Sequence, residues 1–120
     1  MSSIRSDRLY LDDIIASADA IARYLAGFDR DRFLSDEVMC DAVLRRLIVI
    51  GEAASRVSAD LRARHPAVAW GSARDFRNFA VHGYFSLEWS IVWETAVSDV
   101  PKLRFAIATV RAVEFPGHDT

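Results

Sequence analysis

The chain has 120 residues, of which 52% are hydrophobic and 27% are charged, and its formal net charge is −2 at pH 7. This composition predicts one globular domain over residues 1–120 and excludes a disordered chain. The uninterrupted apolar runs are too short to cross a bilayer, so no membrane association is expected. The slightly negative charge argues against strong electrostatic attraction to nucleic acids as the main activity.

The N-terminal stretch "MSSIRSDRLYLDD" lacks the apolar core of a signal peptide, and the single cysteine, Cys40, allows no intramolecular disulfide. A cytoplasmic location is therefore expected. Residues 1–44 hold five arginines against nine acidic residues, whereas residues 45–111 hold ten basic against six acidic residues. Arginine supplies 14 of the 15 basic residues. That preference is compatible with RNA binding and equally with the codon bias of a GC-rich genome.

Apolar residues recur at spacings of three and four, which predicts helices throughout. A first helix runs from Leu9 to Phe28 and closes around Gly27. A second begins near Ser35 and continues to about Arg64, before His65-Pro66 stops it. Gly51 lies in its middle beside two alanines, which predicts a close helix crossing at that point.

The second half of the chain predicts three further helices. Ser72 and Asp75 form a capping-box variant for a third helix from Ala73 to about His82. Ser86 is a candidate cap for a fourth helix, "LEWSIVWETAVSDV", and Pro101 suits the first turn of a fifth. The expected fold is all-α, an antiparallel bundle of about five helices with short connections.

The third helix separates polar and apolar side chains. At 100° per residue, one arc collects Arg74, Arg77, Asn78 and His82, and aromatic and alanine side chains take the opposite side. Val81 lies within the polar arc, which suggests that a second subunit covers this face. Arg77 and His82 are about 140° apart on an ideal helix. They could share one ligand only if the helix end distorts at Gly83 or a partner chain completes the site.

The residue types on this arc allow a specific chemistry. A histidine can give or accept a proton near neutral pH, and arginine can bind a phosphate and stabilise a pentacovalent transition state. Without acidic or metal-binding partners, these are the parts of a metal-independent ribonuclease that uses the 2′-hydroxyl of RNA as its nucleophile. From spacing alone, a solvated helix face is the alternative interpretation.

The motif Arg77-Asn78-x3-His82-x-Tyr84 resembles the Arg-x4–6-His motif of HEPN domains, in its R-N-x3-H-x-Y form. Four further segments resemble the HepT-like branch of that superfamily in order and spacing, so that the similarity covers roughly residues 8–112. They are "VLRRLIVIGEAA" (Val43–Ala54), "LRARHPAVAW" (Leu61–Trp70), "VHGYF" (Val81–Phe85) and "VWETAVSDVPKL" (Val92–Leu103).

The resemblance implies a homodimeric HEPN-like bundle with ribonuclease toxin activity, paired as in type VII toxin–antitoxin systems with a minimal nucleotidyltransferase antitoxin. The resemblance implies RNA as the substrate, with tRNA as one candidate, and no DNA substrate is expected. Carried over to this chain, Arg77 would hold the scissile phosphate and His82 would be the general acid and base. Asn78 would orient His82 or the substrate, and Tyr84 would be the adenylylation target. Arg74 lies outside the motif and is either an auxiliary phosphate contact or a surface ion-pair partner of Asp75 or Asn78.

Charged residues outside the motif, and the histidine, cysteine and glycine patterns, give further predictions. We expect Glu52 to be a structural partner of Arg45 or Arg46, with a catalytic acid as the alternative interpretation, and one of the two arginines to face solvent while the other lines the cleft. Histidine and cysteine spacings predict no metal site, and no glycine-rich phosphate loop is present, so no cofactor is expected. The alternative function is a non-catalytic subunit that binds a nucleotide or docks a nucleotidyltransferase.

Overall fold

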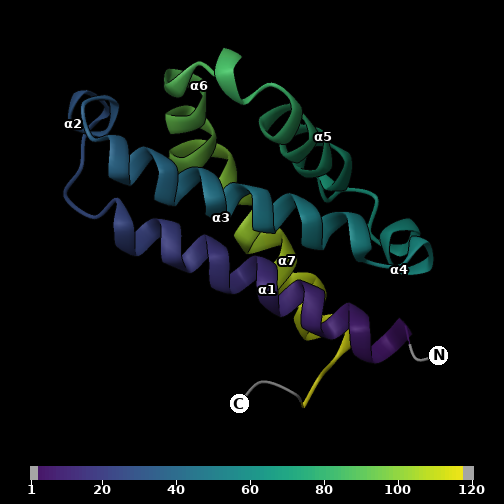
Figure 1. Cartoon of the computed structure of the whole chain (residues 1–120). Helices are drawn as coiled ribbons and strands as arrows, with labels where there is room; N and C mark the ends of the chain where they lie inside the picture. The colour runs from purple at the N-terminus through teal and green to yellow at the C-terminus, as the bar shows by residue number, and fades with distance from the viewer. Residues whose placement is uncertain (1–2, 118–120) are drawn as a thin grey trace.

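The computed structural model describes residues 3–117, with side chains from Asp7 onward. Every regular element in this range is helical, which confirms the expected all-α class (Figure 1). The elements are α1 (Ser3–Tyr24), α2 (Arg30–Leu34), α3 (Glu37–Arg56), α4 (Ala59–Arg64), α5 (Trp70–His82), η1 (Tyr84–Ser86), α6 (Trp89–Glu94), η2 (Thr95–Asp99) and α7 (Val100–Glu114). None of the helices in the described range is both long and apolar enough to cross a membrane.

Helix α3 is the centre of the packing. It lies between α1 on one side and α5 on the other, and α7 packs against α1 (Figure 1). The apolar positions predicted from the helical spacing form the core between these helices, including Leu11, Ile14, Leu47, Ile50 and Ile107. Burying each such side chain completely stabilises the fold by about 1.5–3 kcal/mol.

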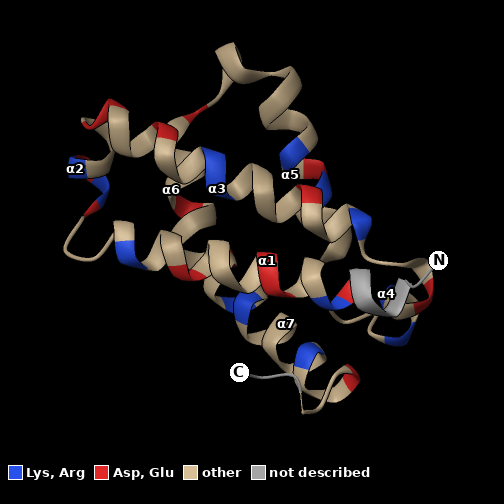
Figure 2. Cartoon of the chain, turned by 60° about the horizontal axis from the view of Figure 1, so that its bottom comes forward, with Lys and Arg blue, Asp and Glu red and all other residues tan. Residues whose placement is uncertain are grey.

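Ion pairs join α1 to α7 along their length, where acidic and basic positions face one another (Figure 2). The Nε of Arg104 lies 3.0 Å from Oδ1 of Asp19, and the Nε of Arg111 lies 2.8 Å from Oδ1 of Asp12. The acidic excess of residues 1–44 is thus partly offset by arginines of the C-terminal helix. These pairs set the register of two helices that are far apart in the sequence.

The predicted second helix, from near Ser35 to about Arg64, is two helices, α3 and α4; its predicted end at Arg64 is confirmed, but its start and its continuity are wrong. Ser35 ends α2, and the side chain of Asp36 caps α3 by accepting a hydrogen bond from the Met39 N–H. Within the predicted helix, Val57 has an extended backbone (φ −61°, ψ 138°) and separates α3 from α4. The reason for that break lies in α1, 51 residues earlier in the chain.

Buried Asp7 accepts hydrogen bonds from the Ser58 backbone N–H at 2.8 Å and from its hydroxyl at 2.6 Å. Ser58 in turn caps α4 by accepting a hydrogen bond from the Leu61 N–H. A continuous helix through residue 58 would occupy that N–H and leave the Asp7 carboxylate buried without its partners, which is costly. This contact therefore favours the break between α3 and α4.

The fourth and fifth predicted helices are one continuous helical run from Trp89 to Glu114. The backbone stays helical through Glu94, Thr95, Asp99 and Val100, with a π-helical segment, η2, in the middle. Pro101 lies in the first turn of α7, as predicted, but α7 continues η2 without a break. The wider π turn leaves room for its ring and removes the demand for the N–H that proline lacks.

The other predicted boundaries also shift. The predicted cap Ser72 lies inside α5, which begins at Trp70 after Ala69 without a side-chain cap. Likewise, Ser86 belongs to η1, and α6 begins after Glu88. The "DRDR" segment that was expected to be a turn contains α2, because Asp29 caps it by accepting a hydrogen bond from the Arg32 N–H at 2.8 Å.

Candidate active site at the α3–α5 crossing

Gly51 lies where α5 crosses α3, as its place in the sequence predicts. A Cβ atom at this position would overlap the Cβ of Arg77 and would come within 2.5 Å of the Ala73 carbonyl oxygen. Only a residue without a side chain allows this approach. The close crossing brings the base of the Arg77 side chain against the α3 backbone and turns the guanidinium toward the neighbouring Glu52.

The Arg77 guanidinium is held by two neighbours. One terminal nitrogen, NH2, lies 3.0 Å from Oε1 of Glu52, and the other, NH1, donates to Oδ1 of Asn78 at 3.0 Å. The Nε atom is buried and has no hydrogen-bond partner among the described residues. A buried donor left in this state costs about 1–3 kcal/mol. The arrangement therefore holds Arg77 in one orientation at the expense of some stability.

Glu52 accepts contacts from two arginines, neither of which is the expected partner. In addition to Arg77, Arg56 places Nε and NH2 each 2.9 Å from Oε2 of Glu52. The expected pairing of Glu52 with Arg45 or Arg46 is therefore wrong. Spacing along one helix identifies the neighbours of Glu52 on α3, but it does not identify Arg77, which α5 brings to the Glu52 carboxylate.

Arg45 and Arg46 point to different neighbours. Arg46 donates from Nε to the Tyr24 hydroxyl of α1 at 3.3 Å, and its guanidinium lies 5.9 Å from the centre of the Tyr24 ring. Arg45 is exposed and has no hydrogen-bond or ion-pair partner within the part of the chain that the structure describes. It follows Asp41 by four residues and precedes Glu52 by seven, so all three share one stripe of α3.

His82 is the last residue of α5 and is exposed to solvent. No hydrogen bond or ion pair joins it to any described residue, and Asn78 binds Arg77 rather than His82. Gly83 ends the helix without turning His82 toward Arg77, because α5 keeps its helical form through His82. Arg77 faces α3 and His82 faces away, as the angle of about 140° between them requires. One copy of the chain therefore does not bring these two side chains together.

Tyr84 follows in η1, where its hydroxyl donates to Oδ1 of Asp41 at 3.2 Å. This hydrogen bond, and then the negative charge of Asp41, raises the pKa of Tyr84 above its ordinary value. The Tyr84 ring makes edge-on contacts with Phe85 and Trp89. Asp41 was not singled out from the sequence, since nothing local connects it to a tyrosine 43 positions later.

Further exposed side chains lie on α5 and in the η1 turn that follows it. Arg74 forms a surface contact with Asp75, with Nε 3.5 Å from Oδ1, which is one of the two alternatives for this residue. Phe79 and Val81 are each nearly half exposed, and Phe85 is fully exposed. Apolar side chains thus surround the end of α5 without being covered by this copy of the chain.

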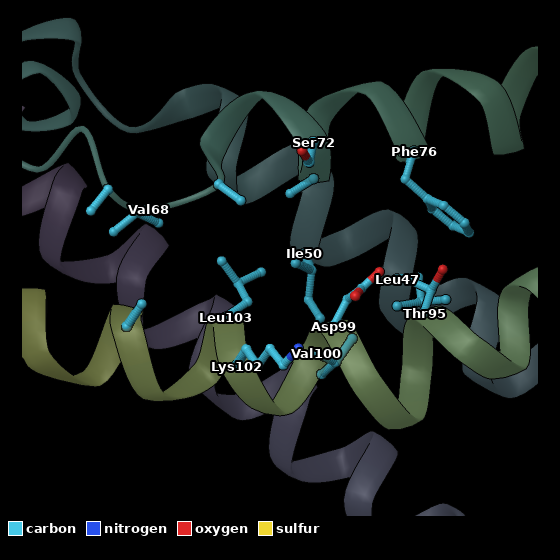
Figure 3. A pocket seen from close by; sticks show the side chains of 14 residues that line it. Leu47, Ile50, Val68, Ser72, Phe76, Thr95, Asp99, Val100, Lys102 and Leu103 are labelled. Carbon is cyan, nitrogen blue, oxygen red and sulfur yellow. The ribbon is translucent and has the colours of Figure 1, made fainter.

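A cavity of about 400 Å³ lies on the opposite flank of α5, between α5, α3 and the η2–α7 segment (Figure 3). Its walls are largely apolar, with Leu47 and Ile50 from α3, Phe76 from α5 and Leu103 from α7. Arg77, His82 and Tyr84 do not line it. The cavity and the candidate chemistry are therefore in different places. Within residues 3–117, no three His, Cys, Asp or Glu side chains form a group that could hold a metal ion.

Comparisons with known proteins place this fold and motif in a class. Residues 14–110 match the family model described as ribonuclease HepT-like. The chain is 31% identical over 108 residues to "Putative RNase MJ1380" of Methanocaldococcus jannaschii, covering 90% of this chain and 99% of that protein. It is also 31% identical over 100 residues to "Probable ribonuclease HepT" of Thermococcus cleftensis, covering 83% of this chain and 91% of that protein. No solved structure gives a significant match.

The class that these findings define is an all-helical protein of ribonuclease-type sequence. More specifically, the chain belongs to the HepT-like ribonuclease family, because the family model spans most of its length.

Proposed function

We propose that this protein is a metal-independent endoribonuclease that acts as a homodimer. The observation that carries the proposal is the environment of Arg77: its guanidinium is fixed against α3, and an exposed His82 without a partner among the described residues follows five residues later on α5. An arginine held in place for a phosphate suits phosphodiester cleavage if a second copy of the chain brings a histidine beside it as general acid and base. The family relationship supports the same conclusion.

In the proposed reaction, the 2′-hydroxyl oxygen of RNA attacks the adjacent phosphorus as His82 accepts its proton. The bond from phosphorus to the 5′-oxygen then breaks, and protonated imidazole supplies a proton to that leaving oxygen. The products are a 2′,3′-cyclic phosphate and a free 5′-hydroxyl. Arg77 stabilises the additional negative charge of the pentacovalent transition state. No metal ion is needed in this sequence of steps.

Two copies are proposed because Arg77 and His82 face different directions in one chain. If two α5 helices pack together through Val81 and the polar arc around it, Arg77 of one copy can lie beside His82 of the other. Asn78 supports Arg77, and Arg74 serves as an auxiliary phosphate contact after leaving Asp75. Burial of Val81 and of the exposed Phe85 would stabilise such a dimer.

The same proposal includes regulation at Tyr84. A nucleotidyltransferase antitoxin would transfer AMP from ATP to this tyrosine: the hydroxyl oxygen attacks the α-phosphate, pyrophosphate leaves, and the hydroxyl proton is lost. The added phosphate places negative charge two residues from His82, where it repels RNA. In this view the protein is the toxin of a cytoplasmic toxin–antitoxin pair, acting on RNA such as tRNA.

The decisive experiment is cleavage of total RNA and tRNA by the purified protein in EDTA, with His82→Ala as the matched variant. Discrete fragments from the wild type alone would support the nuclease and the role of His82. If an unmodified wild type does not cut, the non-catalytic binding subunit becomes the better interpretation. Equal cutting by both proteins would remove His82 from the mechanism. Intact mass after expression with and without the nucleotidyltransferase tests modification of Tyr84.

A further inference from the structure

Arg77 has five N–H groups, and its surroundings account for three of them. NH1 donates one N–H to Asn78, NH2 lies 3.0 Å from Oε1 of Glu52 in an ion pair, and the single N–H of Nε is buried without a partner among the described residues. Each terminal nitrogen therefore keeps one N–H uncommitted. The terminal edge of a guanidinium, formed by NH1 and NH2, can bind two oxygens of one phosphate, which is a bidentate geometry that arginine favours.

The orientation of this edge depends on Glu52. Asn78 is the next residue after Arg77 on α5, so it cannot fix the guanidinium relative to α3. Glu52 lies on α3 and therefore holds the guanidinium in place relative to a second helix. Arg56 holds the other carboxylate oxygen of Glu52, so the acceptor is itself anchored. Gly51, the preceding residue, provides the space for the approach.

We infer that Glu52 is a positioning residue of the proposed ribonuclease, which directs the terminal edge of Arg77 toward the scissile phosphate while Arg56 anchors Glu52. This inference rests on the proposed function. Glu52 does not contact RNA or exchange a proton in the reaction. Its role is to fix a cation whose flexible side chain would otherwise sample many orientations.

This role predicts opposite effects on binding and on turnover. Removing the charge of Glu52 makes the surface around Arg77 more positive, so RNA is attracted more strongly. At the same time Arg77 loses the partner that orients it, so the chemical step slows. If Glu52 instead kept Arg77 from reaching RNA, its removal would give faster cleavage. If the contact between Glu52 and Arg77 were purely structural, its removal would change only the amount of folded protein.

The test compares Glu52→Gln with the wild type and with Glu94→Gln, on a fluorescent oligoribonucleotide in EDTA. Glutamine keeps the shape of the side chain. Glu94 is exposed and without an ion pair to any described residue, so it controls for the change in charge. We expect Glu52→Gln to lower kcat by about 10- to 100-fold with an unchanged or lower KM, and Glu94→Gln to retain the wild-type kcat.

Three results would overturn the inference: an unchanged kcat, a higher kcat, or a loss that equals the loss of folded protein measured by circular dichroism. A wild type that does not cut would instead refute the proposed function. In that case ¹⁵N NMR of the Arg77 Nε–H, assigned with Arg77→Lys, still tests whether Glu52 holds the Arg77 guanidinium in one orientation. Its resonance should broaden or exchange faster with water in Glu52→Gln than in Glu94→Gln, and identical behaviour would refute the positioning role.

Discussion

The Tyr84 hydroxyl donates a hydrogen bond to Oδ1 of Asp41 at 3.2 Å and thereby ties the turn after α5 to the first half of α3. This contact joins Tyr84, the proposed modification site, to a carboxylate that accepts a hydrogen bond from the tyrosine hydroxyl. It also places Tyr84 at a known distance from an acidic group, so that its titration reports directly on the packing of η1 against α3.

Asp41→Asn should lower the pKa of Tyr84 toward its ordinary value of about 10. In the wild type Asp41 raises the pKa of Tyr84 in the folded protein above its value in the unfolded chain. The contact therefore stabilises the fold at pH values below the Tyr84 pKa of the unfolded chain. This stabilisation is lost as the pH rises through the Tyr84 pKa of the folded protein. Ultraviolet titration of the tyrosines would measure the shift, with Tyr84→Phe identifying which transition belongs to Tyr84. An unchanged titration in Asp41→Asn would contradict the contact.

Glu114 provides a prediction at acidic pH. Hydrogen bonds from Arg64, at 2.9 Å, and from His65, at 2.7 Å, lower the pKa of Glu114 to about 2. Because the folded pKa lies below the unfolded one, this stabilisation is present above about pH 4.5 and disappears as pH falls toward 2. Glu114→Gln should therefore reduce the free energy of unfolding by about 1–3 kcal/mol at pH 7.

Urea denaturation at pH 7 and at successively lower pH would measure this difference. The two proteins should converge in stability as the pH approaches 2, because the wild-type carboxyl then becomes protonated as well. A gap that stays constant over this range would show that Glu114 acts through packing rather than through its charge.

Gly51→Ala should destabilise the protein although alanine is the better helix former. Alanine is favoured by about 1 kcal/mol inside a helix, but its Cβ would overlap Arg77 and force α5 away from α3. Overpacking of this kind costs about 1–3 kcal/mol, so a net loss is expected. Gly71→Ala is the matched control, because its Cβ would meet only the Arg74 guanidinium at 3.7 Å. Thermal unfolding should show opposite shifts for the two variants.

Arg45 and Arg46 should differ in their effect on RNA. Exposed Arg45 has no partner among the described residues, whereas Arg46 is bound to Tyr24. In a His82→Ala background that binds without cutting, Arg45→Ala should weaken binding of an oligoribonucleotide and reduce the salt slope by about one. Arg46→Ala should leave that slope unchanged. Fluorescence anisotropy at several salt concentrations tests this, and equal slopes for all proteins would exclude a phosphate contact by Arg45.

The proposed dimer makes a prediction about mixed copies. Arg77→Ala and His82→Ala should each be inactive, but heterodimers formed by mixing them should regain partial activity. In such a heterodimer one composite site has an intact Arg77 from one copy and an intact His82 from the other. If each site used both residues of a single chain, no mixture could recover. Val81→Arg should prevent recovery by separating the copies, which light scattering would detect.

Local sequence determines much of this protein. Apolar spacing of three and four predicts the helices around the core, and the polar arc on α5 predicts that Arg77 and His82 face different directions. Gly51 was recognisable as a crossing point because a glycine inside a helix is unfavourable unless another backbone approaches it. These features follow from the geometry of single helices, which is why short stretches of sequence contain them.

Tertiary structure decides which side chains meet. The end of α3 at Val57 depends on Asp7, the partner of Glu52 depends on where α5 lies, and the partner of Tyr84 is a carboxylate of α3. Each contact depends on the rotation and offset of one helix against another. Those quantities are set by the packing of the whole core and by the absence of a side chain at residue 51, so spacing within a single helix could not reveal them.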